Sequence, residues 1–116
     1  MKTILVVDDE ENIRTLFRVE LTDEGYTVLT AETAEEALVI LSKQMPDLVT
    51  VDIKLPDMNG VELLRKIKEI NRQLPVIMCT AYDEYKQDFG VWASDGYIVK
   101  SSDLTELKNK IKELIH

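Results

Sequence analysis

Five short runs of apolar and β-branched residues recur along the chain, and each gives way to polar or turn-forming residues. Such runs are typical of strands that are buried on both faces, as in a parallel sheet covered by helices. The central run, LVTV, ends at Asp52 and is followed by the turn-forming stretch PDMNG. The predicted strands cover residues 3–7, 26–30, 48–51, 76–79 and 96–99.

Between these runs, apolar residues recur at helical spacing. The first periodic segment begins at Asn12 and stops before Gly25, a good residue to end a helix. The second begins at Thr33, which has the spacing of a capping box with Glu36. Asp103, or Ser102 before it, is placed to cap the last segment. The residues that recur at helical spacing are Ile13, Leu16, Phe17 and Leu21; Ala34, Ala37, Leu38 and Leu41; Val61, Leu64, Ile67, Lys68 and Ile70; and Leu104, Leu107, Ile111, Leu114 and Ile115.

Alternating strands and helices with short connections indicate the α/β class. We expect a parallel sheet with helices on both faces and right-handed crossovers. The length of 116 residues fits one domain, so residues 1–116 are predicted to form a single unit. Hydrophobic residues make up 45% of the chain and charged residues 31%, a balance that supports a globular core.

The net charge of −8 disfavours direct binding of nucleic acid, because contact with phosphate backbones needs a basic face. It favours cationic partners, including metal ions. The first residues, MKTILVVDDEE, turn acidic after a short apolar run, unlike a signal peptide or membrane span, so we expect a cytoplasmic protein. Cys79 lies in an apolar run and is predicted to be a buried, unreactive thiol. The sole histidine, His116, is the last residue, which excludes chemistry that needs an internal histidine.

Polar residues follow four of the predicted strands at the point where each ends. In a parallel sheet these C-terminal ends meet at one edge, where open α/β sheets usually carry their sites. Crowded carboxylates repel one another unless a cation, a raised pKa or a lysine compensates them. Magnesium suits such an all-oxygen set, and aspartate is a known nucleophile toward phosphoryl groups. The residues at this edge are Asp8, Asp9, Asp52, Thr80 and Lys100.

Each candidate also has a purely structural interpretation. The acidic pair at positions 8 and 9 could favour the start of the following helix through its dipole, but its pairing with Asp52 makes this the weaker interpretation. Thr80 taken alone could equally well be a simple strand-end residue. Lys54 is most simply a solvated side chain, and Tyr97 an edge aromatic.

The sequence resembles the receiver domains of two-component response regulators over essentially its whole length. The motifs that carry the resemblance are LVVDDEE, VDIKLPDMNG around Asp52, TAY after the fourth predicted strand and GYIVK before the last helix. They occur in the order that the family has them. The resemblance implies a flavodoxin-like fold, in which a five-stranded parallel sheet of order 2-1-3-4-5 is doubly wound with five helices.

The resemblance further implies that Asp52 is the phosphoacceptor of a magnesium-dependent site. Asp9 would be a direct Mg2+ ligand, and Asp8 would help directly or through a water molecule. The Asp52 carboxylate and the backbone carbonyl of Lys54 would complete the protein's share of the ligands. The phosphoryl donor would be a partner histidine kinase or a histidine phosphotransfer protein. The chain would be a regulator rather than an enzyme, catalysing only its own phosphorylation and dephosphorylation.

The remaining residues carried over from the family would read the modification. Lys100 would pair with the phosphoryl oxygens, and Thr80 would bond to one of them only after phosphorylation. Tyr97 would turn inward when Thr80 moves. The added dianion would in this way bias the surface that binds a downstream partner.

Three other functions suit this topology less well. A pseudo-receiver that binds a protein partner without phosphorylation has no need to keep like charges together, although it is the main alternative. A magnesium-dependent phosphohydrolase usually carries a second aspartate two residues after the nucleophile, where this chain has Lys54. A flavin carrier would need a phosphate-binding loop where this chain has DDEE.

Two features depart from the family pattern. Ser101 follows Lys100 where the family usually has a proline after a cis peptide bond, and a cis bond before serine would cost roughly 2.5–4 kcal/mol. The stretch YDEYKQDFGVWAS, residues 82–94, is short for the family's fourth helix and contains Gly90. We therefore expect that helix to be short or irregular and unusually mobile.

Overall fold

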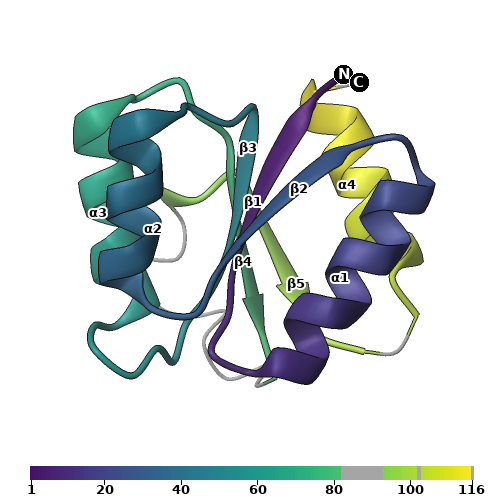
Figure 1. The fold of residues 1–116 in the computed structure, drawn as a ribbon, viewed down its shortest axis with the longest axis horizontal. Coiled ribbons are helices and arrows are strands. Elements are labelled where there is room, and N and C mark those ends of the chain that lie inside the picture. Colours follow the sequence, from purple (N-terminus) through teal and green to yellow (C-terminus); the bar gives the residue numbers. More distant parts are fainter. Residues whose placement is uncertain (82–92, 102, 116) are drawn as a thin grey trace.

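A central parallel sheet covered by helices on both faces forms the molecule (Figure 1). The computed structural model describes residues 1–81, 93–101 and 103–115. The strand order is β2-β1-β3-β4-β5, and all four strand pairs are parallel, which confirms the predicted fold class and topology. The elements in chain order are β1 (Thr3–Val7), α1 (Glu11–Asp23), β2 (Thr27–Ala31), α2 (Ala34–Lys43), β3 (Leu48–Asp52), α3 (Gly60–Ile70), β4 (Val76–Thr80), β5 (Gly96–Val99) and α4 (Thr105–Ile115).

Four helices lie in the described residues, whereas the sequence predicts five. The remaining predicted helix falls in the stretch 82–94, of which residues 82–92 lie outside the described part, so its irregular form stays a prediction. Ser102, one of the two candidate caps of the last helix, also lies outside it, while the other, Asp103, accepts a hydrogen bond from the Thr105 amide at 2.9 Å. In the part of the chain that the structure describes, no helix has the length and apolar character to cross a bilayer.

The sheet divides the hydrophobic core into two clusters, one under α2 and α3 and the other under α1 and α4 (Figure 1). Alternate residues of β1 serve the two sides: Leu5 and Val7 join the first cluster, Ile4 and Val6 the second. All residues of β3 and β4 are buried, which explains why their sequences are continuous apolar runs instead of alternating patterns. Cys79 on β4 is buried as predicted, and burial raises the pKa of its thiol to about 12.

The helix ends follow local chemistry that the sequence predicts. Gly25 adopts φ of +96° directly after α1, a conformation that glycine tolerates and that commonly ends a helix. The Thr33 hydroxyl accepts a hydrogen bond from the Glu36 amide at 3.0 Å and caps α2. Asn59, which from the sequence is predicted only to be part of a turn, does the same for α3, where its side-chain oxygen accepts from the Val61 amide at 2.8 Å.

Several predicted boundaries differ from the observed ones by one residue: α1 starts at Glu11, β2 ends at Ala31, and β3 and β4 include Asp52 and Thr80. Two of the differences have a visible cause. The second strand starts at Thr27 and not at Tyr26, because the Tyr26 amide donates to the carbonyl of Leu21 and closes the end of α1 instead of joining the sheet. The third helix starts at Gly60 and not at Val61, because Asn59 is its cap.

The buried face of α3 does not coincide with the residues that carry its predicted helical spacing. Leu63, which is not part of that spacing, is fully buried, whereas Ile70, which is part of it, is 52% exposed. Ile70 is the last residue of α3. Helical spacing gives the direction of a side chain but not the point at which the underlying sheet ends, so the last turn cannot be assigned from periodicity alone.

Candidate functional site

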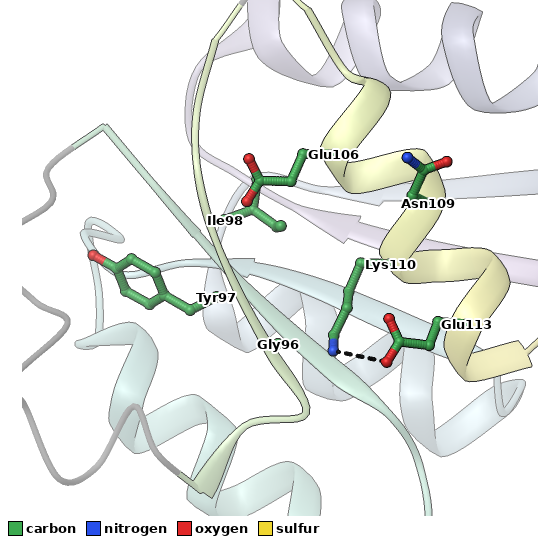
Figure 2. Close-up of a pocket in the computed structure, with 7 residues that line it drawn as sticks. All are labelled: Gly96, Tyr97, Ile98, Glu106, Asn109, Lys110 and Glu113. Atoms are coloured by element: carbon green, nitrogen blue, oxygen red, sulfur yellow. Dashed lines mark hydrogen bonds and ion pairs between the residues drawn. The ribbon is translucent and has the colours of Figure 1, made fainter.

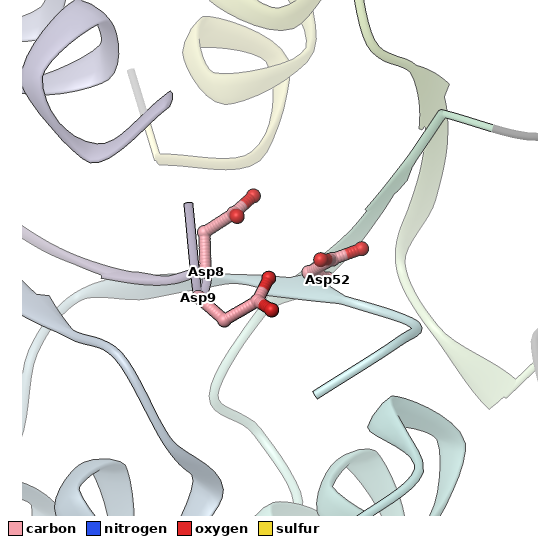
Figure 3. Close-up of side chains that lie close together, drawn as sticks. All are labelled: Asp8, Asp9 and Asp52. Carbon is pink, nitrogen blue, oxygen red and sulfur yellow. The ribbon is translucent and has the colours of Figure 1, made fainter. Parts of the chain in front are cut away.

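Three carboxylates converge at the C-terminal edge of the sheet. Asp8 and Asp9 follow β1, and Asp52 ends the neighbouring strand β3. Figure 3 shows the side chains grouped in one place, and each offers an oxygen that lies within 4.8 Å of the other two. Asp8 and Asp52 are buried, with 2% and 6% of their surface exposed, while Asp9 is exposed. The sequence prediction that the strand ends bring these residues together is confirmed.

Lys100 enters this cluster from the residue after β5. Its ammonium lies 2.5 Å from Oδ2 of Asp8 and 3.4 Å from Oδ2 of Asp52, and its side chain is 9% exposed. Its backbone amide donates to the carbonyl of Thr80 at 2.7 Å, which fixes where the side chain leaves the sheet. A single lysine therefore bridges the two buried carboxylates, with the shorter contact to Asp8.

Burial and charge act in opposite directions on the acid–base behaviour of this site. Burial raises the pKa of the Asp52 carboxyl from 3.8 to about 6, the Lys100 ammonium lowers it, and the charge of Asp8 raises it further. For Lys100, burial alone would lower the pKa, but the hydrogen bond and charge of Asp8 outweigh it, so the pKa is raised. At neutral pH the site therefore holds an ammonium ion beside a mostly ionised Asp52.

Backbone contacts hold Asp8 in place from three sides. The Asp8 amide donates to the carbonyl of Ala31 at the end of β2, at 3.0 Å. Its Oδ1 accepts from the Glu10 amide at 3.0 Å, and its carbonyl accepts from the Arg14 guanidinium at 2.9 Å. These hydrogen bonds stabilise the short turn that connects the end of β1 to the start of α1. The carboxylate is thus aimed at the site by the fold around it and not by its own strand alone.

The loop from β3 to α3 is closed tightly beneath Asp52. The Gly60 amide donates to the carbonyl of Ile53 at 2.7 Å, and Lys54 and Asn59 form an antiparallel bridge. A Cβ at Gly60 would lie 2.2 Å from the backbone oxygen of Asp52, so only glycine fits at this position without a shift. The Lys54 amide lies 3.4 Å from Oδ1 of Asp52. The loop therefore follows the carboxylate closely and carries Lys54 to the rim of the site.

The two predicted switch residues lie on the neighbouring strands. Thr80 is buried at the end of β4. Tyr97 on β5 is half-buried and packs against the cluster under α2 and α3. The peptide bond between Lys100 and Ser101 is trans, as are all peptide bonds of the described residues, and Lys100 still reaches both carboxylates. Proline after the lysine is therefore not needed for this contact.

A second hollow lies between β5 and α4, away from the carboxylates. Figure 2 shows Tyr97 pointing from β5 away from α4, while Lys110 and Glu113 project from α4 toward the strand. The Lys110 ammonium lies 3.5 Å from the Glu113 carboxylate. The stem of Lys110 passes so close to Gly96 that a Cβ there would lie 2.9 Å from its Cε. The lysine and its ion pair are thus two of the polar groups in the hollow, and Glu106 and Asn109 of α4 line it as well.

The acidic cluster has the donor set of a site for a hard divalent cation. Carboxylate oxygens are the ligands that Mg2+ takes from proteins. One ammonium from Lys100 leaves two of the three negative charges uncompensated, a balance that a divalent cation fits. A cavity at this edge is lined by Asp9, Glu10, Asp52, Lys54, Ala81 and Lys100, so Lys54 borders the space beside the carboxylates.

One set of contacts at this edge is not visible in the sequence pattern. Asp57, at the tip of the β3–α3 loop, accepts hydrogen bonds from the backbone amides of Ala34 and Glu35 at 3.0 Å and 2.9 Å. These donors hold the pKa of the Asp57 carboxyl below its usual value. In the sequence, Asp57 is one of several turn formers. Its partners lie more than twenty residues away, and only the folded topology brings them together.

Comparison with known proteins gives a consistent result over the whole chain. Residues 4–112 match the family model for the response regulator receiver domain. The alkaline phosphatase synthesis transcriptional regulatory protein PhoP of Bacillus subtilis is 36% identical over 116 residues. That alignment covers 98% of this chain and 48% of PhoP, so this chain spans about half the length of that relative.

Solved structures agree in fold. The response regulator protein TrrA from Thermotoga maritima, crystallised in complex with Mg2+-BeF, superposes with a TM-score of 0.96 at 46% identity, covering 99% of this chain and 100% of TrrA. TrrA has also been crystallised in complex with the histidine kinase ThkA, and that TrrA chain superposes with a TM-score of 0.94 at 46% identity, with full coverage of both chains.

Proposed function

Because this chain belongs to the response regulator receiver domain family, we propose that it accepts a phosphoryl group on Asp52 and signals through the resulting change in its surface. The donor is a histidine kinase or a histidine phosphotransfer protein. The complex of the similar regulator TrrA with a histidine kinase supports a kinase as the partner. Residues 1–116 act as one receiver unit in this proposal.

The observation that carries the proposal is the carboxylate cluster with its buried lysine. Like charges at this density are unfavourable, and a fold keeps them only where they have a partner or a task. Asp52 ends the central strand and borders the cavity at the sheet edge, so a donor has access to its carboxylate. Lys100 lies beside it with a positive charge at 3.4 Å. The cluster thus combines a nucleophile with a fixed cation.

The chemistry that follows is a transfer between a nitrogen and an oxygen. A carboxylate oxygen of Asp52 attacks phosphorus, the bond between phosphorus and the imidazole nitrogen of the donor breaks, and the electron pair leaves with the imidazole. Asp52 must be ionised to attack, which it mostly is at neutral pH. Lys100 exchanges part of its contact with the carboxylates for the phosphoryl oxygens as their charge arrives.

The carboxylates of Asp8, Asp9 and Asp52 would hold a magnesium ion, together with the backbone carbonyl of Lys54. The chemistry of the donor set fits this ion, and the complex of TrrA with Mg2+-BeF supports it. When bound, the ion supplies positive charge that stabilises the oxygens of the transferred group. The protein's part is to direct the carboxylates at one point, and the backbone contacts of Asp8 fix the position of one of them.

Thr80 and Tyr97 would convert the modification into a change of surface. The Thr80 hydroxyl is a donor that can meet a phosphoryl oxygen at the end of the neighbouring strand. Tyr97 lies on the next strand and is half-buried, so a turn inward when Thr80 moves would bury surface that is exposed here. In this proposal the chain is a regulator whose only catalysis is its own phosphorylation and dephosphorylation, and it acts in the cytoplasm without binding nucleic acid directly.

Intact mass spectrometry after incubation with acetyl phosphate and Mg2+ tests the proposal. The native chain should gain one phosphoryl group, and the adduct should be absent without Mg2+ and in Asp52→Asn. Asp47→Asn is a matched control, because Asp47 lies at the opposite end of the same strand, where its carboxylate accepts from the Thr3 amide at 2.7 Å. This variant should be phosphorylated like the native chain.

The outcomes separate the possible functions. An adduct that persists in Asp52→Asn would assign the phosphoacceptor to another residue. A folded native chain that binds Mg2+ but takes no phosphoryl group from several small donors would favour a pseudo-receiver, which binds its partner without phosphorylation.

A further inference from the structure

We propose that Asp57 is a positioning residue of the phosphoacceptor site, because its carboxylate ties the loop after Asp52 to the first turn of α2. In this position it holds the Lys54 carbonyl and the end of β3 in the arrangement that binds a divalent cation. The inference rests on the proposed function, since it concerns the same site. It assigns a role to a residue that touches neither the cation nor the phosphoryl group.

The contact itself is bidentate and crosses between two elements. Oδ1 of Asp57 accepts from the Ala34 amide at 3.0 Å, and Oδ2 accepts from the Glu35 amide at 2.9 Å. These are the first two residues of α2. The first amides of a helix have no acceptor within the helix, and a negative charge is favourable at this end. Asp57 therefore meets two donors that need an acceptor, and the helix holds the loop as firmly as the loop caps the helix.

Thr33 caps the same helix in a different way. Its hydroxyl accepts from the Glu36 amide, and its carbonyl accepts from the Ala37 amide at 3.1 Å. Both contacts are local, and neither reaches the loop after β3. The α2 N-terminus thus has two separable caps. Only the cap from Asp57 connects the helix to the phosphoacceptor loop.

The loop is short and internally bonded, so the tether at its tip reaches the site. The tip carrying Asp57 is joined to Asp52 through the bridge between Lys54 and Asn59 and through the bond from the Gly60 amide to the Ile53 carbonyl. A displacement at the tip therefore moves the Lys54 carbonyl directly, because no flexible linker lies between them.

The other side of the tether also leads to the site. The segment that precedes α2 is the end of β2, where the Ala31 carbonyl accepts from the Asp8 amide. The contacts of Asp57 thus close a ring that runs from Asp52 through the loop and the start of α2 to Asp8. The ring fixes the backbone positions of Asp8 and Asp52 relative to each other, while the Lys100 ammonium bridges their carboxylates.

Three variants separate positioning from simple capping: Asp57→Ala, Asp57→Asn and Thr33→Ala. Mg2+ affinity is measured by isothermal titration calorimetry, stability by urea unfolding, and the phosphorylation rate with acetyl phosphate. Asp57→Ala should raise the Kd for Mg2+ about tenfold, the lower end of the effect of residues that orient metal ligands. Asp57→Asn keeps one acceptor oxygen and should lie between this variant and the native chain. Thr33→Ala should lower stability and leave the Kd within about twofold.

The inference is overturned if the Asp57 variants and Thr33→Ala lose similar stability and all keep the native Kd, because Asp57 is then only a helix cap. Asp57→Asn keeps this test decisive if Asp57→Ala does not fold. The proposed function has a separate readout. If the native chain takes no phosphoryl group, that function fails, while a higher Kd in the Asp57 variants would still establish the positioning role toward the cation.

Discussion

A methyl group added at Gly60 tests how closely the start of α3 approaches the phosphoacceptor strand. The new Cβ would lie 2.2 Å from the backbone oxygen of Asp52 and 2.8 Å from the Cα of Ile53. Contacts of a Cβ atom below 3.0 Å essentially do not occur, and both neighbours are backbone atoms that no rotamer change can move. The gap between strand and helix must therefore open by about 0.8 Å at this point.

The magnitude follows from what resists this opening. Overpacking of a well-packed site costs about 1–3 kcal/mol. The bond from the Gly60 amide to the Ile53 carbonyl, at 2.7 Å, stretches or breaks as the helix moves, which costs about 1 kcal/mol. Alanine is a better helix former than glycine, which returns at most about 1 kcal/mol. These contributions together span about 1–4 kcal/mol, and we expect Gly60→Ala to lose about 2–3 kcal/mol of the unfolding free energy, near the middle of that range.

The assay pairs urea unfolding with phosphorylation by acetyl phosphate, and Gly25→Ala is the control. A Cβ at Gly25 meets no atom within 4 Å, but its φ of +96° is unfavourable for alanine, at a cost of about 1 kcal/mol. The control should lose stability and keep the native phosphorylation rate. Gly60→Ala should lose more stability and also slow phosphorylation, because Asp52 moves. Equal stability losses and an unchanged rate in Gly60→Ala would refute the reasoning.

Three further perturbations test the charged contacts. Lys100→Met leaves Asp8 and Asp52 buried without their cation. The variant should lose about 3 kcal/mol of unfolding free energy in metal-free buffer and recover part of it in Mg2+. Urea unfolding with and without the ion measures both effects, and an unchanged unfolding free energy would contradict the prediction. Lys68→Met removes an ammonium that donates to two carbonyls between α3 and β4 and to a carboxylate before β5. Urea unfolding should reveal a loss of about 1–2 kcal/mol in the free energy of unfolding. A loss of only a few tenths would mean that solvent replaces these hydrogen bonds. The pKa of Asp57 is lowered by its amide donors, so its stabilising contribution is complete above the ordinary aspartate pKa of about 3.9 and is lost as the pH falls through the folded-state value. The stability difference between the native chain and Asp57→Asn should therefore be constant near neutral pH and shrink in acid, and a difference that stays unchanged in acid would exclude this origin.

The sequence was most informative where one property determined the structure. The apolar runs end at Asp8, Asp52, Thr80 and Lys100. In a parallel sheet the C-terminal ends of the strands lie at one edge, so these residues must meet there. The cap at Thr33 could also be predicted from the sequence, because its hydrogen-bond partner, Glu36, is only three residues away. Local chemistry and sheet topology were therefore enough to predict the fold and to predict which residues lie at this edge of the sheet.

Features that depend on distances between elements could not be obtained in this way. The preference of Lys100 for Asp8 over Asp52 depends on where the Lys100 amide is bonded, and a residue list contains no such distance. The bond from Asp57 to the start of α2 joins two turns that are remote in sequence, and any turn former could have occupied that position. The exposure of Ile70 depends on where the sheet ends.

The strand order also determines when the site becomes charged during synthesis of the chain. The sheet positions 2-1-3 come from the first 52 residues, so all three carboxylates leave the ribosome with that half of the molecule. Lys100 follows 48 residues after Asp52, about 2–10 s later at translation rates of roughly 5–20 residues per second. For that interval the carboxylates of the nascent half-domain lack their lysine, and dissolved cations can offset their repulsion. The residue that follows the last strand is therefore the one that brings a positive charge to the end of the first strand.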